Sequence, residues 1–339
     1  LLCSTVPEEY GGSGGDFGHS AVMIEELARV NATAIGFTTH SEIVAPYLVA
    51  YGSEEQKQRW LPRMASGELI GVIAMSEPGI GSDLRSMRTG ARREGDHYVI
   101  NGQKTFITNG GNAGLVVTAT KLDPQSRDLT LVCVEEDTEG FSKGKLLEKI
   151  GLKGQDTSEL FFDNVRVPVT NMLLGEGRGF EIAQGRLGPG RIHHCMRLIG
   201  RAERALEAMC RRSLERVAFG RPIADQGVTR ERIANARIMI DQTRFLVLNA
   251  AHKMDTVGNK DARQEIAMIK VAAPAMACQV IDWAMQVHGG GAVGQGECLA
   301  RGPAPAGEPL LQPGIGPLQL FRRMRQALAA LVRIAAQGA

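Results

Sequence analysis

Two short segments of the sequence combine residue types that could hold a flat, redox-active ring. Residues 75–83 read MSEPGIGSD and place two hydroxyls, Ser76 and Ser82, on a turn whose proline and glycines keep the backbone open to a ligand. Residues 101–110 read NGQKTFITNG, in which Phe106 and Thr108 alternate with Ile107. Alternating residues of a strand share a face, so we expect this aromatic ring and this hydroxyl to lie side by side.

An isoalloxazine ring requires this combination of groups. An aromatic or apolar side chain must cover one flat face of the ring, and a hydroxyl or amide must donate a hydrogen bond to its N5 edge to stabilise the reduced form. The two segments therefore predict a flavin site to which Phe106, Thr108 and the two hydroxyls of the turn contribute.

Three other patterns in the sequence suggest different chemistry, and their context argues against each. Residues 289–294 match G-x-G-x-x-G but follow a predicted helix, whereas a dinucleotide-binding loop follows a strand. Residues 11–15 match the nucleophile elbow of serine hydrolases, yet no strand leads into them, which favours a turn. His193, His194 and Cys195 are helix neighbours that point about 100° apart and cannot converge on one ion, so no metal site is predicted.

The composition excludes several classes of function. With 39 Lys and Arg against 37 Asp and Glu, the net charge of +2 provides no field that would attract nucleic acid or an anionic membrane. The six cysteines are scattered, which favours free thiols in a reducing compartment. The sequence has no run of eighteen apolar residues and no signal-peptide pattern at its start, so we expect no membrane span. A cytoplasmic protein is expected, or a mitochondrial matrix protein whose transit peptide lies outside this chain.

The first seventy residues and the next hundred differ in their hydrophobic period. Helices are predicted at 19–30 and 41–51, and a third begins at a Ser53 capping box and stops at Pro62. From Leu69 the sequence predicts short strands joined by hairpins without crossover helices, with turn dipeptides at 95–96, 101–102 and 109–110. The predicted strands are 69–75, 91–93, 97–100, 104–107, 115–120, 129–134 and 159–167.

The remainder of the chain is helical in pattern. Helices are predicted at 191–216, 229–257 and 261–287, and residues 261–264 are predicted to cap the last of them. Three such helices with short connections indicate an antiparallel bundle, which usually needs a fourth helix to close its core. The candidate for the fourth helix is 318–336. The predicted fold is α+β: an N-terminal helical domain (1–68), a central β-barrel-like domain (69–174) and a C-terminal helical bundle (175–339) whose tail is atypical from about residue 291.

Six motifs occur in the order found in acyl-CoA dehydrogenases, and the chain resembles that family from Pro7 to Gly290. Up to Val169 it resembles long-chain-type members, whereas residues 171–290 resemble the branch often fused to a kinase-like domain. The resemblance also implies about forty helical residues ahead of Pro7. The motifs are PEEYGG (7–12), SEPGIGSD (76–83), NGQKTFITNG (101–110), FDNVRVP (162–168), GEGRGF (175–180) and RVAFGR (216–221).

The resemblance implies specific roles in binding FAD and an acyl-CoA. Ser76 resembles the hydroxyl that contacts flavin N5, Phe106 the aromatic over the ring, and Arg216 with Phe219 the pair that reaches the cofactor of a neighbouring subunit. Ser82 resembles a residue near both the cofactor and the acyl-CoA thioester, and Arg191 one in the substrate site. The remaining implied cofactor contacts are Met75, Thr108, Gln286, Gly289 and Gly290.

The catalytic base is where the sequence departs from the family. Long-chain-type members carry glutamate immediately before the arginine that corresponds to Arg191, but Gly190 stands there. The other branch uses an acidic residue in a late segment resembling ADGPDEVH, which this chain lacks. After Gly290 the only carboxylates are Glu297 and Glu308, of which Glu308, in a flexible Pro- and Gly-rich segment, is the candidate base.

The implied reaction is the FAD-dependent α,β-dehydrogenation of a fatty acyl-CoA to its trans-2-enoyl-CoA, as in β-oxidation. The implied partners are a fatty acyl-CoA, an electron-transfer flavoprotein and further copies of the chain in a homotetramer or dimer. Two alternatives remain open at this point: an acyl-CoA oxidase that uses O2, and a catalytically impaired, flavin-binding remnant of the family. The sequence does not indicate the length or branching of the acyl chain.

Overall fold

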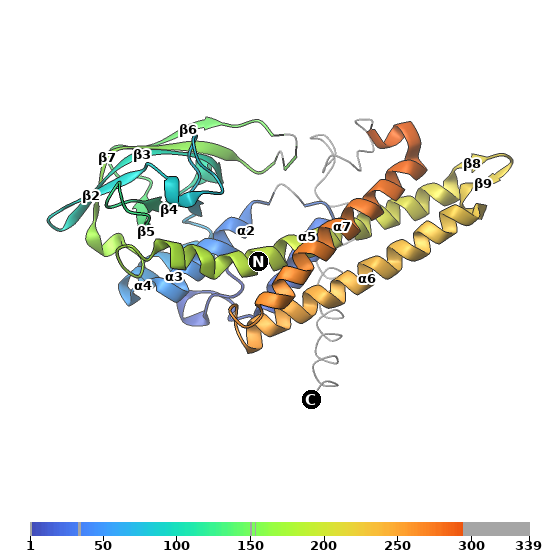
Figure 1. Cartoon of the computed structure of the whole chain (residues 1–339), viewed down its shortest axis with the longest axis horizontal. Helices are drawn as coiled ribbons and strands as arrows, with labels where there is room; N and C mark the ends of the chain where they lie inside the picture. Colours follow the sequence, from blue (N-terminus) through green and yellow to red (C-terminus); the bar gives the residue numbers. More distant parts are fainter. Residues whose placement is uncertain (1, 33–34, 150, 153, 294–339) are drawn as a thin grey trace. The chain divides into compact units, whose positions relative to one another are not determined.

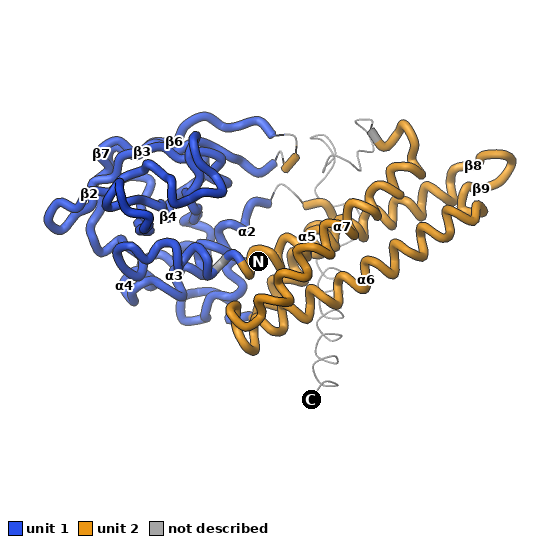
Figure 2. Tube along the Cα trace, viewed as in Figure 1, with its two compact units in different colours: residues 1–15, 34–149, 153–187 blue, residues 16–33, 150–152, 188–339 orange. Residues whose placement is uncertain are grey.

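The computed structural model describes residues 2–32, 35–149, 151–152 and 154–293 (Figure 1). The chain divides into two compact units (Figure 2). Unit 1 comprises residues 1–15, 34–149 and 153–187, and unit 2 comprises residues 16–33, 150–152 and 188–339. The helical start, central β region and helical end confirm the predicted α+β fold class.

Unit 1 begins with short helices whose ends follow local sequence signals. They are η1 (Glu8–Tyr10), α2 (Phe37–Thr39), the π-helical η2 (His40–Val44), α3 (Ala45–Tyr51) and α4 (Glu54–Ser66). The predicted capping box opens α4, because the Gln56 amide donates to Ser53 Oγ at 3.3 Å and the Gln56 side chain accepts from the Ser53 amide at 2.9 Å. The predicted stop at Pro62 is wrong, since α4 continues through Pro62 and ends where Gly67 adopts a left-handed φ of 83°.

Two sheets make up the β region of unit 1. The first has the order β1 (Gly71–Ala74), β4 (Leu115–Thr120), β5 (Thr130–Glu135), with β1 and β4 parallel. The second is antiparallel, with the order β2 (Gly90–Glu94), β3 (His97–Thr108), β7 (Thr157–Pro168), β6 (Phe141–Leu146). The expected barrel is therefore not closed, and the parallel β1–β4 pair corrects the expectation of hairpins alone.

The two sheets share one apolar core. Val72, Val116 and Val132 of the first sheet lie in the same buried cluster as Tyr98 and Leu160 of the second. The opposite face of the first sheet packs against the early helices through a second cluster, which joins Leu115, Val117 and Leu131 to Leu48, Trp60 and Leu61. The first sheet is covered on both faces, which explains why all six residues of β4 are buried.

Unit 2 is built on three long helices, α5 (Gly179–Glu215), α6 (Gly227–Thr256) and α7 (Arg263–His288). The first nine residues of α5 belong to unit 1. The helix runs through Pro189 and so begins before the predicted start at Arg191. The N-cap of α7 is Ala262, which makes no side-chain capping bond, so the predicted cap at 261–264 is wrong. The predicted fourth helix at 318–336 lies outside the described residues.

Helix α1 (Phe17–Arg29) packs with the long helices, although the sequence pattern placed it in a separate N-terminal domain. Phe17, Ala21 and Ile24 join α5, α6 and α7 in one buried cluster. The Phe17 amide donates to Asp255 Oδ1 of α6 at 3.0 Å, and its ring stacks on that of His193, with centroids 4.6 Å apart. Helix α1 therefore contributes to the core of unit 2.

One helix is long and apolar enough, by length and composition, to cross a membrane. It covers residues 263–292 and comprises α7 with the following 3-10 turn, η7 (Gly289–Val293). Its Ile266, Ile269, Met276 and Val280 are buried in the core cluster of unit 2. Among the described residues, packing in this core therefore explains why part of the helix is apolar.

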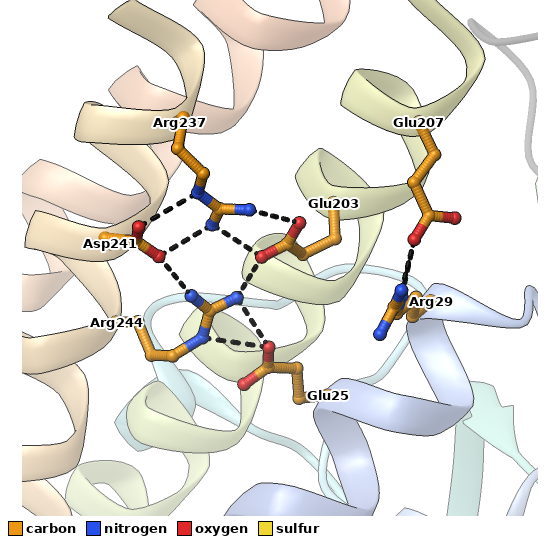
Figure 3. A network of polar contacts seen from close by, with 7 residues as sticks. All are labelled: Glu25, Arg29, Glu203, Glu207, Arg237, Asp241 and Arg244. Atoms are coloured by element: carbon orange, nitrogen blue, oxygen red, sulfur yellow. Dashed lines mark hydrogen bonds and ion pairs between the residues drawn. The ribbon is translucent and has the colours of Figure 1, made fainter. Parts of the chain in front are cut away.

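A network of five charged residues ties α1, α5 and α6 together (Figure 3). Glu203 of α5 accepts hydrogen bonds from Arg237 at 2.6 and 2.9 Å and from Arg244. Arg244 also donates to Glu25 of α1 at 2.8 and 3.0 Å, and Asp241 receives hydrogen bonds from both arginines. Burial alone would raise the pKa of Glu203, but the hydrogen bonds and charges of the arginines hold it below its usual value.

We expect Glu203→Gln to lower the free energy of unfolding by about 3 kcal/mol, because it removes the largely buried charge that faces Arg237 and Arg244. Glu207→Gln is the matched control: it breaks the half-exposed ion pair with Arg29 seen in Figure 3, at a cost of less than about 1 kcal/mol. In the unfolded chain the pKa of Glu203 has the ordinary value of a glutamate, about 4, and in the folded chain it is lower. The ionised Glu203 therefore stabilises the fold at a pH above about 4, and this stabilisation is lost as the pH falls through the lower pKa of the folded chain. Urea titrations at pH 7 and pH 3 measure both effects, and equal losses in the two variants would contradict the assignment.

Candidate functional site

The loop that follows β1 forms a tight turn exposed to solvent. The Glu77 amide donates to the Ile80 carbonyl at 3.2 Å, and the Ile80 amide donates back to the Glu77 carbonyl at 3.1 Å. Pro78 and Gly79 are exposed at the tip, and a Cβ placed on Gly79 or Gly81 would meet nothing within 4 Å. The backbone of this loop is therefore accessible at Gly79 and Gly81, and its contact with a ligand stays a prediction.

A bulge in β3 turns Phe106 out of the sheet. The pairing of β3 with β7 shifts register between Lys104 and Ile107, and Phe106 adopts a left-handed φ of 59° that bulky residues rarely adopt. Its side chain is 69% exposed, whereas Ile107 is buried and Thr108 is half-buried. Phe106 and Thr108 are thus both more exposed than Ile107, and Phe106 lies in a bulge instead of a regularly alternating strand.

Backbone hydrogen bonding joins the loop to the bulge. The Thr105 amide donates to the Ser76 carbonyl at 2.9 Å, which places Ser76 beside the residue that precedes Phe106. The structure therefore brings Met75, Ser76, Phe106 and Thr108 into one region of unit 1. Their expected contacts with a flavin stay predictions.

The end of β3 is anchored by polar contacts on both sides. Asn109 has a left-handed φ of 61°, and its side-chain amide donates to the Gly36 carbonyl at 2.7 Å. Asp156 accepts from the Gly111 amide at 2.7 Å and from the Asn112 side chain at 3.1 Å. These contacts fix the backbone immediately after Thr108.

Ser82 is exposed on the segment between the turn and the short helix η3 (Leu84–Ser86). The Arg85 guanidinium lies over the Phe180 ring, 4.5 Å from its centroid, which ties this segment to the start of α5 within unit 1. Ser82 itself is accessible, and its expected place near the substrate stays a prediction.

Arg216 and Phe219 lie on an exposed hairpin between α5 and α6. Strands β8 (Val217–Ala218) and β9 (Arg221–Pro222) pair across a two-residue turn, in which Phe219 and Gly220 have left-handed φ values of 55° and 78° (Figure 1). Positive φ at both central residues is typical of the tight turns that join antiparallel strands. Phe219 is 97% exposed, and no described residue forms an ion pair with the exposed Arg216.

The other expected residues of unit 2 are exposed at two places. Arg191 is exposed on α5, beside the half-buried Gly190. Gln286 lies in the last turn of α7, where its side chain donates to Asp282 at 3.3 Å, and Gly289 and Gly290 follow in η7. A Cβ on either glycine would meet nothing within 4 Å, so the backbone there can be approached closely.

Two further expectations concern the catalytic base and metals. Glu308, the candidate base, lies outside the described residues, as does Glu297. Within residues 2–293, apart from the short gaps, no group of three or more His, Cys, Asp or Glu side chains could hold a metal ion.

Sequence reasoning missed two charged residues next to the loop and the bulge. Lys104 is fully buried and Glu77 is 7% exposed, and their charged groups lie 2.9 Å apart. The available signal was their position: Glu77 follows Ser76 directly, and Lys104 precedes Phe106 by two residues. Charged residues are usually exposed, so position alone did not identify the pair.

Comparisons with known proteins match this architecture. Family models for the N-terminal, middle and C-terminal domains of acyl-CoA dehydrogenases match residues 1–68, 72–165 and 177–303. The chain is 44% identical over 261 residues to acyl-CoA dehydrogenase family member 11 of Mus musculus, a match that covers 74% of the chain but 34% of the relative. It is 43% identical over 258 residues to the probable acyl-CoA dehydrogenase FadE2 of Mycobacterium tuberculosis, covering 74% of the chain and 63% of the relative.

Solved structures agree with these matches. The acyl-CoA dehydrogenase of Geobacillus kaustophilus has a TM-score of 0.81 and 37% identity, covering 98% of this chain and 86% of that one. Butyryl-CoA dehydrogenase of Megasphaera elsdenii has a TM-score of 0.81 and 30% identity, covering 96% of this chain and 82% of that one. The chain thus spans only about a third of the mouse relative but most of the solved structures. It belongs to the acyl-CoA dehydrogenase family.

Proposed function

We propose that this chain catalyses the FAD-dependent α,β-dehydrogenation of a fatty acyl-CoA to its trans-2-enoyl-CoA. The observation that carries the proposal is the exposed Phe106, held outward at a left-handed φ beside the Ser76 loop. A bulky residue adopts this conformation only where its surroundings impose it, and such residues cluster at ligand sites. Membership of the family supports the same reaction class.

The residues present fit a flavin. Phe106 offers an apolar face, the neighbouring Ser76 offers a hydroxyl, and the open glycines of the loop leave the backbone accessible. The exposed Arg216 offers a cation for the pyrophosphate. Bound FAD would supply the two-electron acceptor for the hydrogen that leaves the β-carbon. PigA, a solved structure with FAD and proline, has a TM-score of 0.80 to this chain at 27% identity.

The chain's own residues divide into those that hold the cofactor and those that hold the substrate. We assign Met75, Ser76, Phe106 and Thr108 to the flavin ring, with the Ser76 hydroxyl donating to the N5 edge. Ser82 and Arg191 are assigned to the acyl-CoA, with Ser82 also near the cofactor. The residues assigned to the rest of the cofactor, across a subunit interface, are Arg216, Phe219, Gln286, Gly289 and Gly290.

The proposed partners follow from the proposed reaction. A reduced flavin must pass its electrons on, and an electron-transfer flavoprotein is the proposed acceptor. A chain with a TM-score of 0.81 to this one, at 31% identity, occurs in a solved structure named for the electron transferring flavoprotein of Acidaminococcus fermentans. A cofactor site shared between subunits requires a homo-oligomer, for which we propose a dimer or tetramer. The proposed location is the cytoplasm, with the mitochondrial matrix as the alternative.

Anaerobic titration with fatty acyl-CoAs tests the function. Bleaching of the flavin absorbance, with enoyl-CoA formed in equal amount, is the expected result. A bound flavin that no acyl-CoA reduces would favour the impaired remnant, an alternative that Gly190 supports because it supplies no carboxylate. Peroxide formation during aerobic turnover would favour the oxidase. One solved structure similar to this chain, with a TM-score of 0.78, is an oxidase by name, the prolyl acyl carrier protein oxidase AnaB.

We expect Ser76→Ala to leave FAD bound but to slow its reduction by about 100-fold, because one preorganised hydrogen bond to developing charge is typically worth this much. Stopped-flow absorbance measures the reduction rate, and the absorbance ratio of flavin to protein measures occupancy. Ser142→Ala, at an exposed position on β6, is the control and should behave as the parent chain does. A normal reduction rate in Ser76→Ala would remove Ser76 from the site.

A further inference from the structure

The ion pair between Lys104 and Glu77 is buried within unit 1. The Lys104 side chain is 0% exposed and that of Glu77 is 7% exposed, with Nζ and Oε1 2.9 Å apart. Burial lowers the pKa of Lys104 to about 8, although the charge and hydrogen bond of Glu77 oppose the shift. Burial also works against the ionised form of Glu77, but hydrogen bonds from Thr89 and Arg88 and the charge of Lys104 hold its pKa below the usual value.

The contacts of the pair link segments that are separate in the sequence. Glu77 accepts hydrogen bonds from the amides of Arg88 at 2.7 Å and Thr89 at 2.9 Å. Lys104 donates to the Met75 carbonyl at 3.2 Å, and its Nζ lies 3.9 Å from Met87 Sδ. The pair therefore joins β3 to both ends of the segment that contains the exposed turn.

The pair also lies where the loop and the bulge meet. Glu77 is the residue after Ser76, and Lys104 is the residue before Thr105, whose amide donates to the Ser76 carbonyl at 2.9 Å. The register shift that turns Phe106 outward begins at Lys104. A displacement of either charged side chain would consequently move the backbone of both Ser76 and Phe106.

Stability alone does not account for a buried pair of this kind. Removing two charges from water is costly, and apolar side chains of similar size often replace such a pair without loss of stability. Directional hydrogen bonds, which apolar side chains cannot make, are what the pair adds. We propose that Glu77 and Lys104 are positioning residues, which fix the Ser76 loop against the Phe106 bulge in the geometry that the flavin site requires; this rests on the function proposed above.

The double variant Glu77→Gln with Lys104→Met separates positioning from stability. It leaves no buried charge and keeps one side-chain oxygen that can accept from the Arg88 or Thr89 amide, so its melting temperature should recover from the loss seen in either single variant. It removes the Lys104 hydrogen bonds to Met75 and Glu77, which join β3 to the loop. Positioning should not recover: in the FAD-free chain the Thr105 amide should exchange with deuterium at least about 10-fold faster than in the parent. In the FAD-loaded chain, flavin reduction by a saturating acyl-CoA should fall by about 10- to 100-fold. The midpoint potential of the flavin, measured by chemical reduction, should shift as well.

The partly exposed ion pair between Glu94 of β2 and Arg166 of β7, in the same sheet, provides the control; its charged groups lie 2.8 Å apart. Glu94→Gln with Arg166→Met should leave Thr105 exchange and the midpoint potential at parent values. If Thr105 exchange and the midpoint potential of the flavin both keep their parent values in the double variant of Glu77 and Lys104, the proposal is overturned and the pair serves stability alone. Amide exchange and midpoint potential do not depend on substrate turnover, so a parent chain that fails to oxidise acyl-CoA still allows this decision.

Discussion

Glutamate at position 190 should increase the rate at which a saturating fatty acyl-CoA reduces the bound flavin by at least about 100-fold, because a positioned general base typically contributes 10²- to 10⁴-fold. Long-chain-type members of the family resemble this variant, since they carry glutamate before the arginine that corresponds to Arg191. The parent chain has Gly190 there, in the middle of α5.

Position 190 can accept the new side chain. It is half-buried, and a Cβ built on Gly190 meets nothing within 4 Å. Glycine within a helix costs about 1 kcal/mol relative to alanine, so Gly190→Glu should not lower the melting temperature. A faster reduction would therefore reflect chemistry and not a repaired fold.

Stopped-flow measurement of anaerobic flavin reduction provides the test, with Gly190→Gln as the control that matches the shape of glutamate without its charge. Gly190→Gln should reduce no faster than the parent. Equal rates in the two variants would contradict a role as base. No acceleration in Gly190→Glu, with FAD bound in parent amounts, would show that a missing carboxylate is not what limits the parent.

Loss of Arg216 should weaken FAD binding by about 30-fold or more, which corresponds to about 2 kcal/mol. Removing one member of a desolvated charge pair typically costs 2 to 5 kcal/mol, and we assign Arg216 to the pyrophosphate of the cofactor. Arg216 is exposed and forms no ion pair with the described residues, so it is available for an external anion.

Fluorescence titration of the FAD-free variants measures this effect. Arg211→Ala, which removes the same charge from an exposed position on α5, is the control and should retain the parent affinity. Because Arg216 is assigned to a site across a subunit interface, the assembly of the variants must be checked as well. Sedimentation velocity should show that both variants assemble as the parent does. Unchanged FAD affinity in Arg216→Ala, or an equal loss in Arg211→Ala, would contradict the assignment.

Local signals in the sequence were sufficient for much of the fold. The Ser53 capping box and the β2–β3 hairpin at Gly95 were predicted correctly because each depends on residues a few positions apart. The parallel pairing of Gly71 with Leu115 could not be predicted in this way, because no turn connects the two strands. The Asn101–Gly102 dipeptide resembled a turn but lies within β3, where a register shift accommodates it.

The candidate site shows the same division. Phe106 and Ser76 were identified from their residue types and neighbours, and the structure places them close together through the Thr105 hydrogen bond. The Glu77–Lys104 pair beneath them was not predicted, because burial of a charged residue depends on a partner that only the folded chain supplies. Residue chemistry thus indicated the exposed part of the site, whereas its support required the structure.

The packing of α1 against α6 has a consequence for the newly synthesised chain. Glu25 of α1 and Arg244 of α6 are 219 positions apart. At about 5 to 20 residues per second, the ribosome therefore completes α1 roughly 10 to 40 seconds before it adds Arg244. During that interval the face formed by Phe17, Ala21 and Ile24 has no α6 to cover it. Exposed apolar surface of this kind is what chaperones bind. Production of this protein should therefore depend more on chaperone supply than its final stability would indicate.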